Sequence, residues 1–189
     1  MSIKSSCSTR FYELNNGFLP YIGCESGDDE VLALVEKGET YQSSLIALNK
    51  IKQAGMKSSV MILNGLGGPE LSRQHAINSA KLMNEAQPNY LSTLVVSFPL
   101  GEQRFAEKFT QASLQPFRQL TQQELFTEME ILLSELDLEK TIFRSDHASN
   151  YLVLKGVLGD DKEALLSQVR LALHQPSDVN LRQEWQRGL

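Results

Sequence analysis

The sequence predicts an α/β protein built on a parallel sheet, and two observations carry this prediction. Short apolar runs with the length of buried strands alternate along the chain with segments of helical periodicity. The clearest run, 59–64, stops at three glycines and is followed by a helical pattern. Such alternation forms parallel sheets with right-handed crossovers. Three or four strands are visible, whereas a complete barrel needs eight. We therefore expect a small open sandwich or a piece of a larger fold.

Composition limits the class of protein. The 189 residues are enough for one domain with a buried core, and 41% apolar with 22% charged residues is typical of folded globular chains. The formal net charge of −5 argues against binding to nucleic acid or to an anionic membrane. No apolar run approaches the roughly 20 residues of a spanning helix, and the N-terminus has no hydrophobic signal region. We expect a cytoplasmic protein that binds neither membrane nor nucleic acid.

The first half of the chain begins with a polar lead-in over residues 1–17, which closes on the turn signal Asn15-Asn16-Gly17. Ser26 or Asp28 can cap the first helix, because both side chains accept hydrogen bonds from free backbone N–H groups. The predicted elements are, in order, a strand over 18–24, a helix around 31–35, a helix from Thr40 to Gly55, and the strand over 59–64.

The second half continues the alternation. Ser72 is predicted to cap the helix after the glycines, and the sequence Thr121-Gln-Gln-Glu124 is a capping box. Residues 98–120 are irregular, with a short helix around 102–110. Trp185 lies in the polar tail and is expected to anchor it on the body of the protein. The predicted elements are a helix that ends before Pro88, a strand over 90–97, a helix from the capping box to Leu136, a short strand over 141–144, and a last helix from Asp160.

Three polar groups follow predicted strands, at the sheet edge where ligands of parallel α/β proteins bind. Glu25-Ser26-Gly27 offers a carboxylate to a ribose diol or an amine, or else caps the next helix. The turn Gly65–Glu70 lets backbone N–H groups approach a ligand but lacks the signature of a phosphate loop. The run 144–151 holds an arginine, an acid, a histidine and an asparagine within seven residues. His147 there is a general base or a hydrogen-bond donor, or else part of a polar network at the sheet end.

The remaining histidines and cysteines indicate little chemistry. His75 is expected at the surface or behind a site, and His174 suits the last turn of the final helix. Cys7 and Cys24 are 17 residues apart and are expected to be free thiols, with Cys24 buried in a strand. We expect no metal site, because zinc and iron–sulfur sites need three or four ligands. No serine lies in a GxSxG turn, so the sequence does not support a Ser–His–Asp triad.

Three segments resemble radical S-adenosylmethionine (SAM) enzymes of the Fe–S oxidoreductase type. Residues 21–32, Tyr-Ile-Gly-Cys-Glu-Ser-Gly-Asp-Asp-Glu-Val-Leu, are similar to a segment of these enzymes. The region 48–68, which ends in Leu-Asn-Gly-Leu-Gly-Gly, is similar to their fifth-strand region. Residues 143–152, Phe-Arg-Ser-Asp-His-Ala-Ser-Asn-Tyr-Leu, resemble a run near the C-terminus of an uncharacterised subgroup. The resemblance covers about 18–189.

The resemblance implies a partial (β/α)6 TIM-like barrel, of which this chain holds the fourth strand onward, with a C-terminal helical extension. It implies that 18–145 form half of the barrel and that 146–189 form a C-terminal cap and helix. It also implies that SAM lies across the carboxyl ends of the strands. Arg144, His147 and Asn150 would close the substrate end, as catalytic candidates without assigned chemistry. The implied cofactor-binding residues are Glu25, Ser26, Leu63, Asn64, Gly65, Gly67, Leu94 and Val96.

The sequence departs from the family in one respect that decides what we expect. The loop Cys-x3-Cys-x2-Cys, which holds the [4Fe–4S] cluster in this family, is absent from the sequence. We therefore expect a C-terminal fragment of a radical SAM Fe–S oxidoreductase. Its parent would use SAM and the cluster, and this chain alone would bind no cluster and be inactive. The expected partner is the missing N-terminal half or another copy at the sheet edge.

Two other functions stay open at this point. The first is a non-catalytic binding or assembly module, a half barrel that dimerises through its exposed sheet edge, because unpaired edges invite association. The second is a metal-free hydrolase that uses His147 with Asp146. The sequence names no substrate, because enzymes of one fold differ in their substrate contacts.

Overall fold

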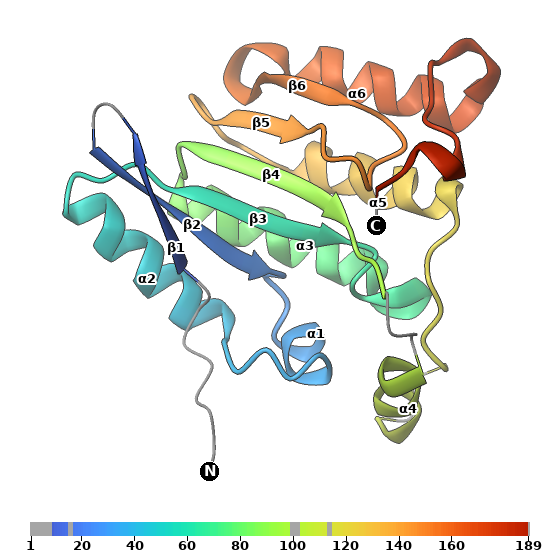
Figure 1. The fold of residues 1–189 in the computed structure, drawn as a ribbon, viewed down its shortest axis with the longest axis horizontal. Helices are drawn as coiled ribbons and strands as arrows, with labels where there is room; N and C mark the ends of the chain where they lie inside the picture. The colour runs from blue at the N-terminus through green and yellow to red at the C-terminus, as the bar shows by residue number, and fades with distance from the viewer. Residues whose placement is uncertain (1–8, 15–16, 99–102, 113–114, 189) are drawn as a thin grey trace.

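The structure is a computed structural model, which describes residues 9–14, 17–98, 103–112 and 115–188. Strands and helices alternate along the chain and form one six-stranded sheet with helices packed on it (Figure 1). The strands are β1 (Thr9–Leu14), β2 (Gly17–Glu25), β3 (Ser59–Asn64), β4 (Tyr90–Val95), β5 (Ile142–Ser145) and β6 (Leu154–Val157). The helices are α1 (Asp29–Leu34), α2 (Tyr41–Gln53), α3 (Gly68–Ala86), α4 (Gln103–Gln111), α5 (Gln122–Glu135) and α6 (Leu158–His174), with short 3-10 turns at Pro176–Asp178 and Glu184–Gln186.

The strands follow one another across the sheet in chain order, from β1 to β6. The four central strands, β2 to β5, are parallel, whereas β1 and β6 pair antiparallel to their neighbours and form the two edges. Each parallel connection carries at least one helix, as parallel pairing requires. The predicted α/β class with a parallel sheet is confirmed, and the arrangement is consistent with a partial TIM-like barrel.

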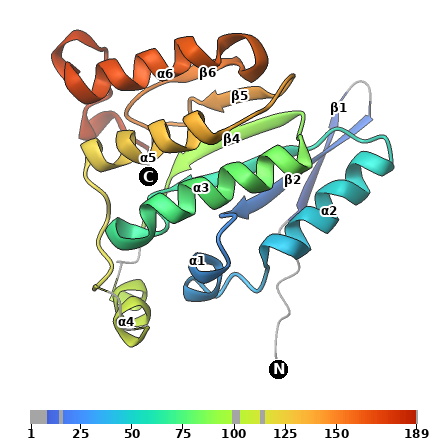
Figure 2. The same cartoon turned by 180° about the vertical axis from the view of Figure 1, so that it is seen from behind.

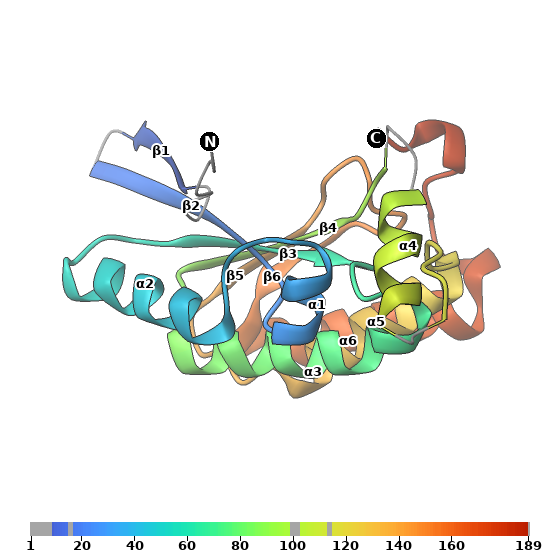
Figure 3. The same ribbon diagram turned by 90° about the horizontal axis from the view of Figure 1, so that it is seen from below.

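The main helices cover only one face of the sheet. Seen from behind, α2, α3, α5 and α6 lie in front of the strands (Figure 2), and the view from below shows them together on one side (Figure 3). The main core fills the space between these helices and the sheet, and it includes Ile22, Val60, Leu91 and Phe143 from the four parallel strands. Side chains on successive strand residues point to opposite faces. Their neighbours in sequence therefore point to the other face, which these helices leave open.

A second apolar cluster closes the carboxyl end of the sheet. It joins α1, the start of α3 and the region of α4, and Phe117 packs edge-to-face on both Phe98 and Phe109, with ring centroids 5.2 and 5.1 Å away. Gly68, with φ of +58°, lies directly against the Phe117 ring, where a Cβ would lie 3.0 Å from that ring. The glycines after β3 therefore serve the packing of this cluster.

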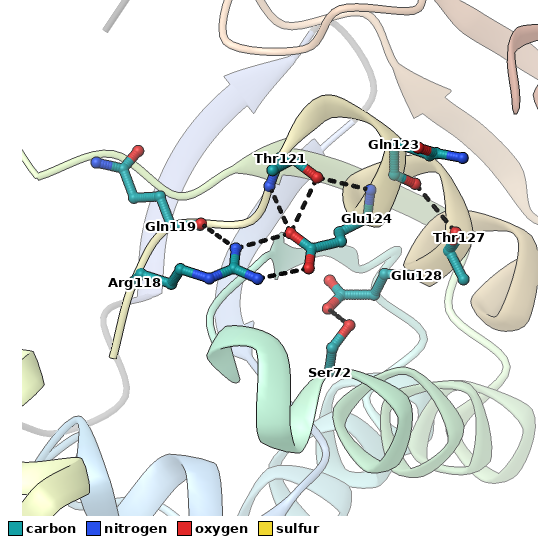
Figure 4. A network of polar contacts seen from close by, with 8 residues as sticks. All are labelled: Ser72, Arg118, Gln119, Thr121, Gln123, Glu124, Thr127 and Glu128. Atoms are coloured by element: carbon teal, nitrogen blue, oxygen red, sulfur yellow. Dashed lines mark hydrogen bonds and ion pairs between the residues drawn. The ribbon is translucent and has the colours of Figure 1, made fainter. Parts of the chain in front are cut away.

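Local sequence signals explain where the helices begin. Asp28 caps α1 by accepting from the Val31 N–H, and Thr40 and Thr121 open α2 and α5 through capping boxes. At Thr121 the capping carboxylate is Glu124, whose pKa falls to about 2 mainly because Arg118 donates hydrogen bonds to it (Figure 4). The predicted capping box over 121–124 is confirmed.

Three expectations differ from the structure. The polar lead-in 1–17 contains β1, which pairs with β2 from Thr9–Ile22 to Leu14–Gly17. A four-residue strand, β6, lies within 146–189 and extends the sheet beside β5. Helix α3 begins at Gly68 with Gly67 as its cap, so Ser72 lies inside the helix and caps nothing. No helix in the described ranges is long and apolar enough to cross a membrane.

Candidate functional site

A cavity of about 520 Å3 lies on the open face of the sheet and crosses all four parallel strands. Its volume is within the usual range for small-molecule sites. The strand register places Met61, Ser92 and Arg144 in one row across β3, β4 and β5, so their side chains share this face. The side chains that give the cavity its chemical character are Glu25, Met61, Ser92, Leu94, Arg144 and His147.

Glu25 forms the end of the cavity at β2. Its φ of +65° lies in the left-handed region, which non-glycine residues rarely adopt, and the pairing of β2 with β3 shifts between Gly23 and Glu25. A bulge of this kind redirects a side chain at the end of a strand. The Glu25 carboxylate lies 3.1 Å from the Lys37 ammonium, and both side chains are less than one fifth exposed. Strained backbone around a half-buried acid is a common feature of functional sites.

The loop after β5 forms the opposite end. Arg144 is exposed on the open face and lines the cavity together with Asp146 and His147. Lys155 of β6 lies 2.9 Å from the Asp146 carboxylate and, as its hydrogen-bond donor, lowers the pKa of that carboxyl. The His147 Nδ1 accepts from the Ser149 N–H at 3.1 Å. A neutral imidazole with an acceptor at Nδ1 carries its proton on Nε2.

Two arginines of the C-terminal segment hold this loop. Arg182 donates to the backbone carbonyls of Asp146, His147 and Asn150 at 2.7 to 3.2 Å. Arg187 donates to the Ser149 carbonyl and stacks over the Tyr151 ring, 3.9 Å from its centroid. The expectation that Trp185 anchors this segment is wrong, because its side chain is 83% exposed. Guanidinium groups that bind loop carbonyls make the attachment instead.

Asn150 is buried and does not line the cavity. Its amide accepts from the Val95 N–H at 2.9 Å and donates to the Thr93 carbonyl at 2.8 Å and to the Ser145 hydroxyl at 3.0 Å. These bonds join the end of β4 to the loop after β5, where the ladder between the strands has ended at Ser92–Arg144. This geometry gives Asn150 a structural role.

Asn150→Ala is expected to lower the free energy of unfolding by about 3 kcal/mol, because it leaves buried donors and acceptors unpaired. Urea unfolding followed by circular dichroism measures this. Asn84→Ala is the matched control, since the half-buried Asn84 also bonds to backbone groups, of Glu135 and Asp137, but through hydrogen bonds that are exposed to solvent. We expect Asn84→Ala to lower the free energy of unfolding by about 1 kcal/mol. Equal losses of unfolding free energy in the two variants would contradict the structural role of Asn150.

A buried polar network lies behind the carboxyl ends of β2 and β3, on the helix side. His75 is 1% exposed, so of the two expected positions the one at the surface is wrong and the one behind the strand ends holds. Its Nε2 donates to the Leu63 carbonyl at 3.0 Å, and its Nδ1 accepts from the Ser26 hydroxyl at 2.7 Å. Ser26 in turn accepts from the Asp28 N–H. His75 therefore connects the segment after β2 to the end of β3.

Glu128 of α5 completes this network. Its carboxylate is 1% exposed, lies 3.9 Å from the His75 Nε2, accepts from the Gly65 N–H at 2.7 Å and accepts from the Ser72 hydroxyl (Figure 4). Burial raises the pKa of Glu128, while His75 and these two hydrogen bonds oppose the rise. The Gly65 N–H is therefore bound within the protein and does not face a ligand.

The structure separates the eight cofactor-binding residues implied by the resemblance into two groups. Glu25 and Leu94 line the cavity. The other six take part in the packing and hydrogen bonding of the carboxyl end of the sheet. These are Ser26 and Gly65 in the buried network, Gly67 at the cap of α3, Leu63 and Val96 in the second apolar cluster, and Asn64, whose carbonyl accepts from the Val96 N–H.

A [4Fe–4S] cluster does not fit the residues that the structure describes. Within the described ranges, no three His, Cys, Asp or Glu side chains come together in a group that could hold a metal ion. Cys24 is 1% exposed and packs in the main core on the helix side of the sheet. It is buried in a strand, as predicted, and cannot reach the cavity. No step of chemistry through a cluster is therefore assigned to these residues.

Comparisons with known proteins support the fold. No family model matches the chain, and no curated protein matches its sequence. Among solved structures, the chain is similar to archaeal Elp3 of Methanocaldococcus infernus with an N-terminal deletion (1–46), with a TM-score of 0.55 and 17% sequence identity. The similarity covers 80% of this chain and 36% of that one, so the chain spans about a third of the Elp3 structure. At this identity the likeness shows the fold alone, an α/β fold that this chain shares with part of the Elp3 structure.

Proposed function

We propose that this chain contributes part of the SAM cleft of a radical SAM Fe–S oxidoreductase. The observation that carries the proposal is the cavity on the open face, which extends from a strained, half-buried carboxylate at Glu25 to the polar loop after β5. The three sequence motifs and the fold shared with Elp3 support the same assignment. The residues that hold the cluster belong, in this proposal, to a part of the assembly beyond those described.

The cavity offers what a nucleoside with a charged tail requires. The Glu25 carboxylate can accept hydrogen bonds from an amine or from ribose hydroxyls, and its ion pair with Lys37 holds it in place. Met61 and Leu94 supply an apolar floor beside it, on which a planar base can lie. SAM, when bound, supplies the cleavable sulfonium, and these residues bind and orient it.

Isothermal titration of the full chain with SAM tests the proposal. We expect one SAM per chain with a dissociation constant between about 10 μM and 1 mM, which corresponds to about 4 to 7 kcal/mol. Glu25→Gln is expected to weaken binding about tenfold, because one charge-assisted hydrogen bond contributes about 1.5 kcal/mol or more. Glu163→Gln, the same change on an exposed residue of α6, is the control and should leave affinity unchanged.

Two results would contradict the proposal: no SAM binding to the unmodified chain, or equal affinities for the two variants. The first result would favour the alternative, a non-catalytic module that associates through a sheet edge. The edges available for such pairing are β1 and β6, since β2 is already covered by β1. We propose the SAM cleft first, because pairing through an edge gives no role to the cavity.

A further inference from the structure

The β5 end of the cavity carries an excess of positive charge among the described residues. Arg144 is exposed and lines the cavity, and its charge adds to the larger effect of Lys155 in lowering the pKa of the Asp146 carboxyl. Asp146, on the loop after β5, forms its ion pair with Lys155, at 2.9 Å. The Arg182 guanidinium, bound to three carbonyls of the same loop, adds a further positive charge. This local excess stands out in a chain whose formal net charge is −5.

Two neutral donors accompany the Arg144 guanidinium. Ser92 is the register partner of Arg144 on β4, so the hydroxyl and the guanidinium emerge side by side on the open face. His147 is exposed and lines the same end of the cavity, and its Nδ1 is occupied by Ser149. The proton of its neutral form is therefore on Nε2, the free nitrogen of the ring.

Ser92 and Arg144 lie on paired strands, and the loop that presents His147 is held in place before any ligand binds. Arg182 donates to the carbonyls of Asp146, His147 and Asn150, and the buried Asn150 amide bonds to the backbone of β4. A preorganised set of donors binds an anion without the cost of ordering a loop. A planar guanidinium binds the two oxygens of a carboxylate or phosphate in parallel, which an ammonium cannot do.

We propose that Arg144, Ser92 and His147 form a subsite for an anionic oxygen group, a carboxylate or a phosphate, on the substrate. Its place in an enzyme rests on the proposed function, but anion binding itself requires no SAM. Neighbouring strands are about 4.8 Å apart, so three spacings place β5 about 14 Å from β2. The Glu25 end and the Arg144 end therefore bind different groups, the cofactor at one and the substrate anion at the other.

Titration of the full chain with inorganic phosphate and, separately, with succinate tests the proposal. Nuclear magnetic resonance follows the ring signals of His147, which His147→Ala identifies among the three histidines. We expect saturable shifts of His147 in at least one titration, which also says whether phosphate or carboxylate is preferred. Arg144→Gln should weaken this binding at least tenfold, and Arg144→Lys should weaken it by an intermediate factor. Arg170→Gln, the same charge change on α6 at a residue paired with Glu130, should change it less than twofold.

The outcomes distinguish this inference from the proposed function. Shifts that do not saturate, or equal effects of Arg144→Gln and Arg170→Gln, overturn the subsite. A loss of SAM affinity in Arg144→Gln as large as the loss of anion affinity also overturns it, because the guanidinium would then bind the carboxylate of SAM. Saturable anion binding in a chain that binds no SAM supports the subsite while the proposed SAM cleft fails.

Discussion

Gly27→Ala is expected to lower the free energy of unfolding by about 3 to 5 kcal/mol, which makes it one of the two most damaging substitutions we predict. A Cβ at Gly27 would lie 2.3 Å from the carbonyl oxygen of Asn78 and 2.7 Å from the Cα of Ser79. Both atoms belong to the backbone of α3, so no side chain can move aside. The segment after β2 would have to shift and lose the hydrogen bond from the Gly27 N–H to the Ser79 hydroxyl.

Gly55→Ala is the control for this prediction. Gly55 has φ of +72°, and a Cβ there meets nothing within 4 Å, so the cost is conformational and about 1 kcal/mol. Urea unfolding of both variants separates the effect of close packing from that of backbone conformation. A Gly27→Ala variant as stable as Gly55→Ala would show that the segment between β2 and α1 is free to shift away from α3.

Glu128→Ala is expected to lower the free energy of unfolding by about 3 kcal/mol, because it leaves the buried Gly65 N–H and Ser72 hydroxyl without their shared acceptor. Glu128→Gln should cost less, since an amide oxygen can still accept from Gly65. Denaturation by urea at pH 7 measures both losses. If Glu128→Ala and Glu128→Gln lose the same free energy of unfolding, the hydrogen bond to Gly65 contributes nothing to the stability of the turn after β3.

The same residue gives a pH dependence whose sign follows from its environment. Burial raises the pKa of Glu128 in the folded state, so the folded state holds this proton more tightly than the unfolded state does. The ionised Glu128 carboxylate therefore lowers the free energy of unfolding, and this loss grows as pH rises above the ordinary glutamate range. His75, whose Nε2 lies 3.9 Å from the Glu128 carboxylate, is unchanged in both proteins that are compared. We expect the stability lost in Glu128→Gln, relative to the unmodified protein, to become smaller as pH rises from 5 to 8.

The sequence was sufficient for the parallel strands and the main helices because their signals are local. The run 59–64 and the capping box at Thr121–Glu124 can be recognised from a few neighbouring residues. Strand β6 has only four residues, and β1 is an edge strand beside a polar terminus, so neither has a continuous apolar run. For β1 a local signal did exist, because Asn16-Gly17 is a common hairpin turn sequence.

The candidate site was harder to predict, because it depends on which face of the sheet a side chain occupies. Glu25 and Ser26 are adjacent, yet Glu25 lines the cavity and Ser26 is fully buried against His75 on the helix side. A shift of one residue exchanges the two faces, and the bulge in β2 adds such a shift. The partners in the buried network are about 50 residues apart in the chain, as Ser26 and His75 are, so periodicity cannot pair them.

For His75 a local signal did exist. It lies four residues after Leu71 and four before Ser79, on the buried stripe of α3. A polar residue on an apolar helical stripe is typical of a buried hydrogen-bond network, because a buried polar group without partners is costly. The surface position was considered for His75 because polar residues, Arg73 and Gln74, precede it in the sequence.

The central claim is that SAM binds on the open face of the sheet, and methionine methyl signals test it most directly. The sequence has five methionines, of which Met61 lines the cavity, while Met83 and Met129 are buried in the main core on the helix side. In a protein labelled with 13C at the methionine methyls, we expect added SAM to shift the Met61 signal and to leave Met83 and Met129 in place. An unchanged Met61 signal, or shifts confined to the two core methionines, would contradict the claim.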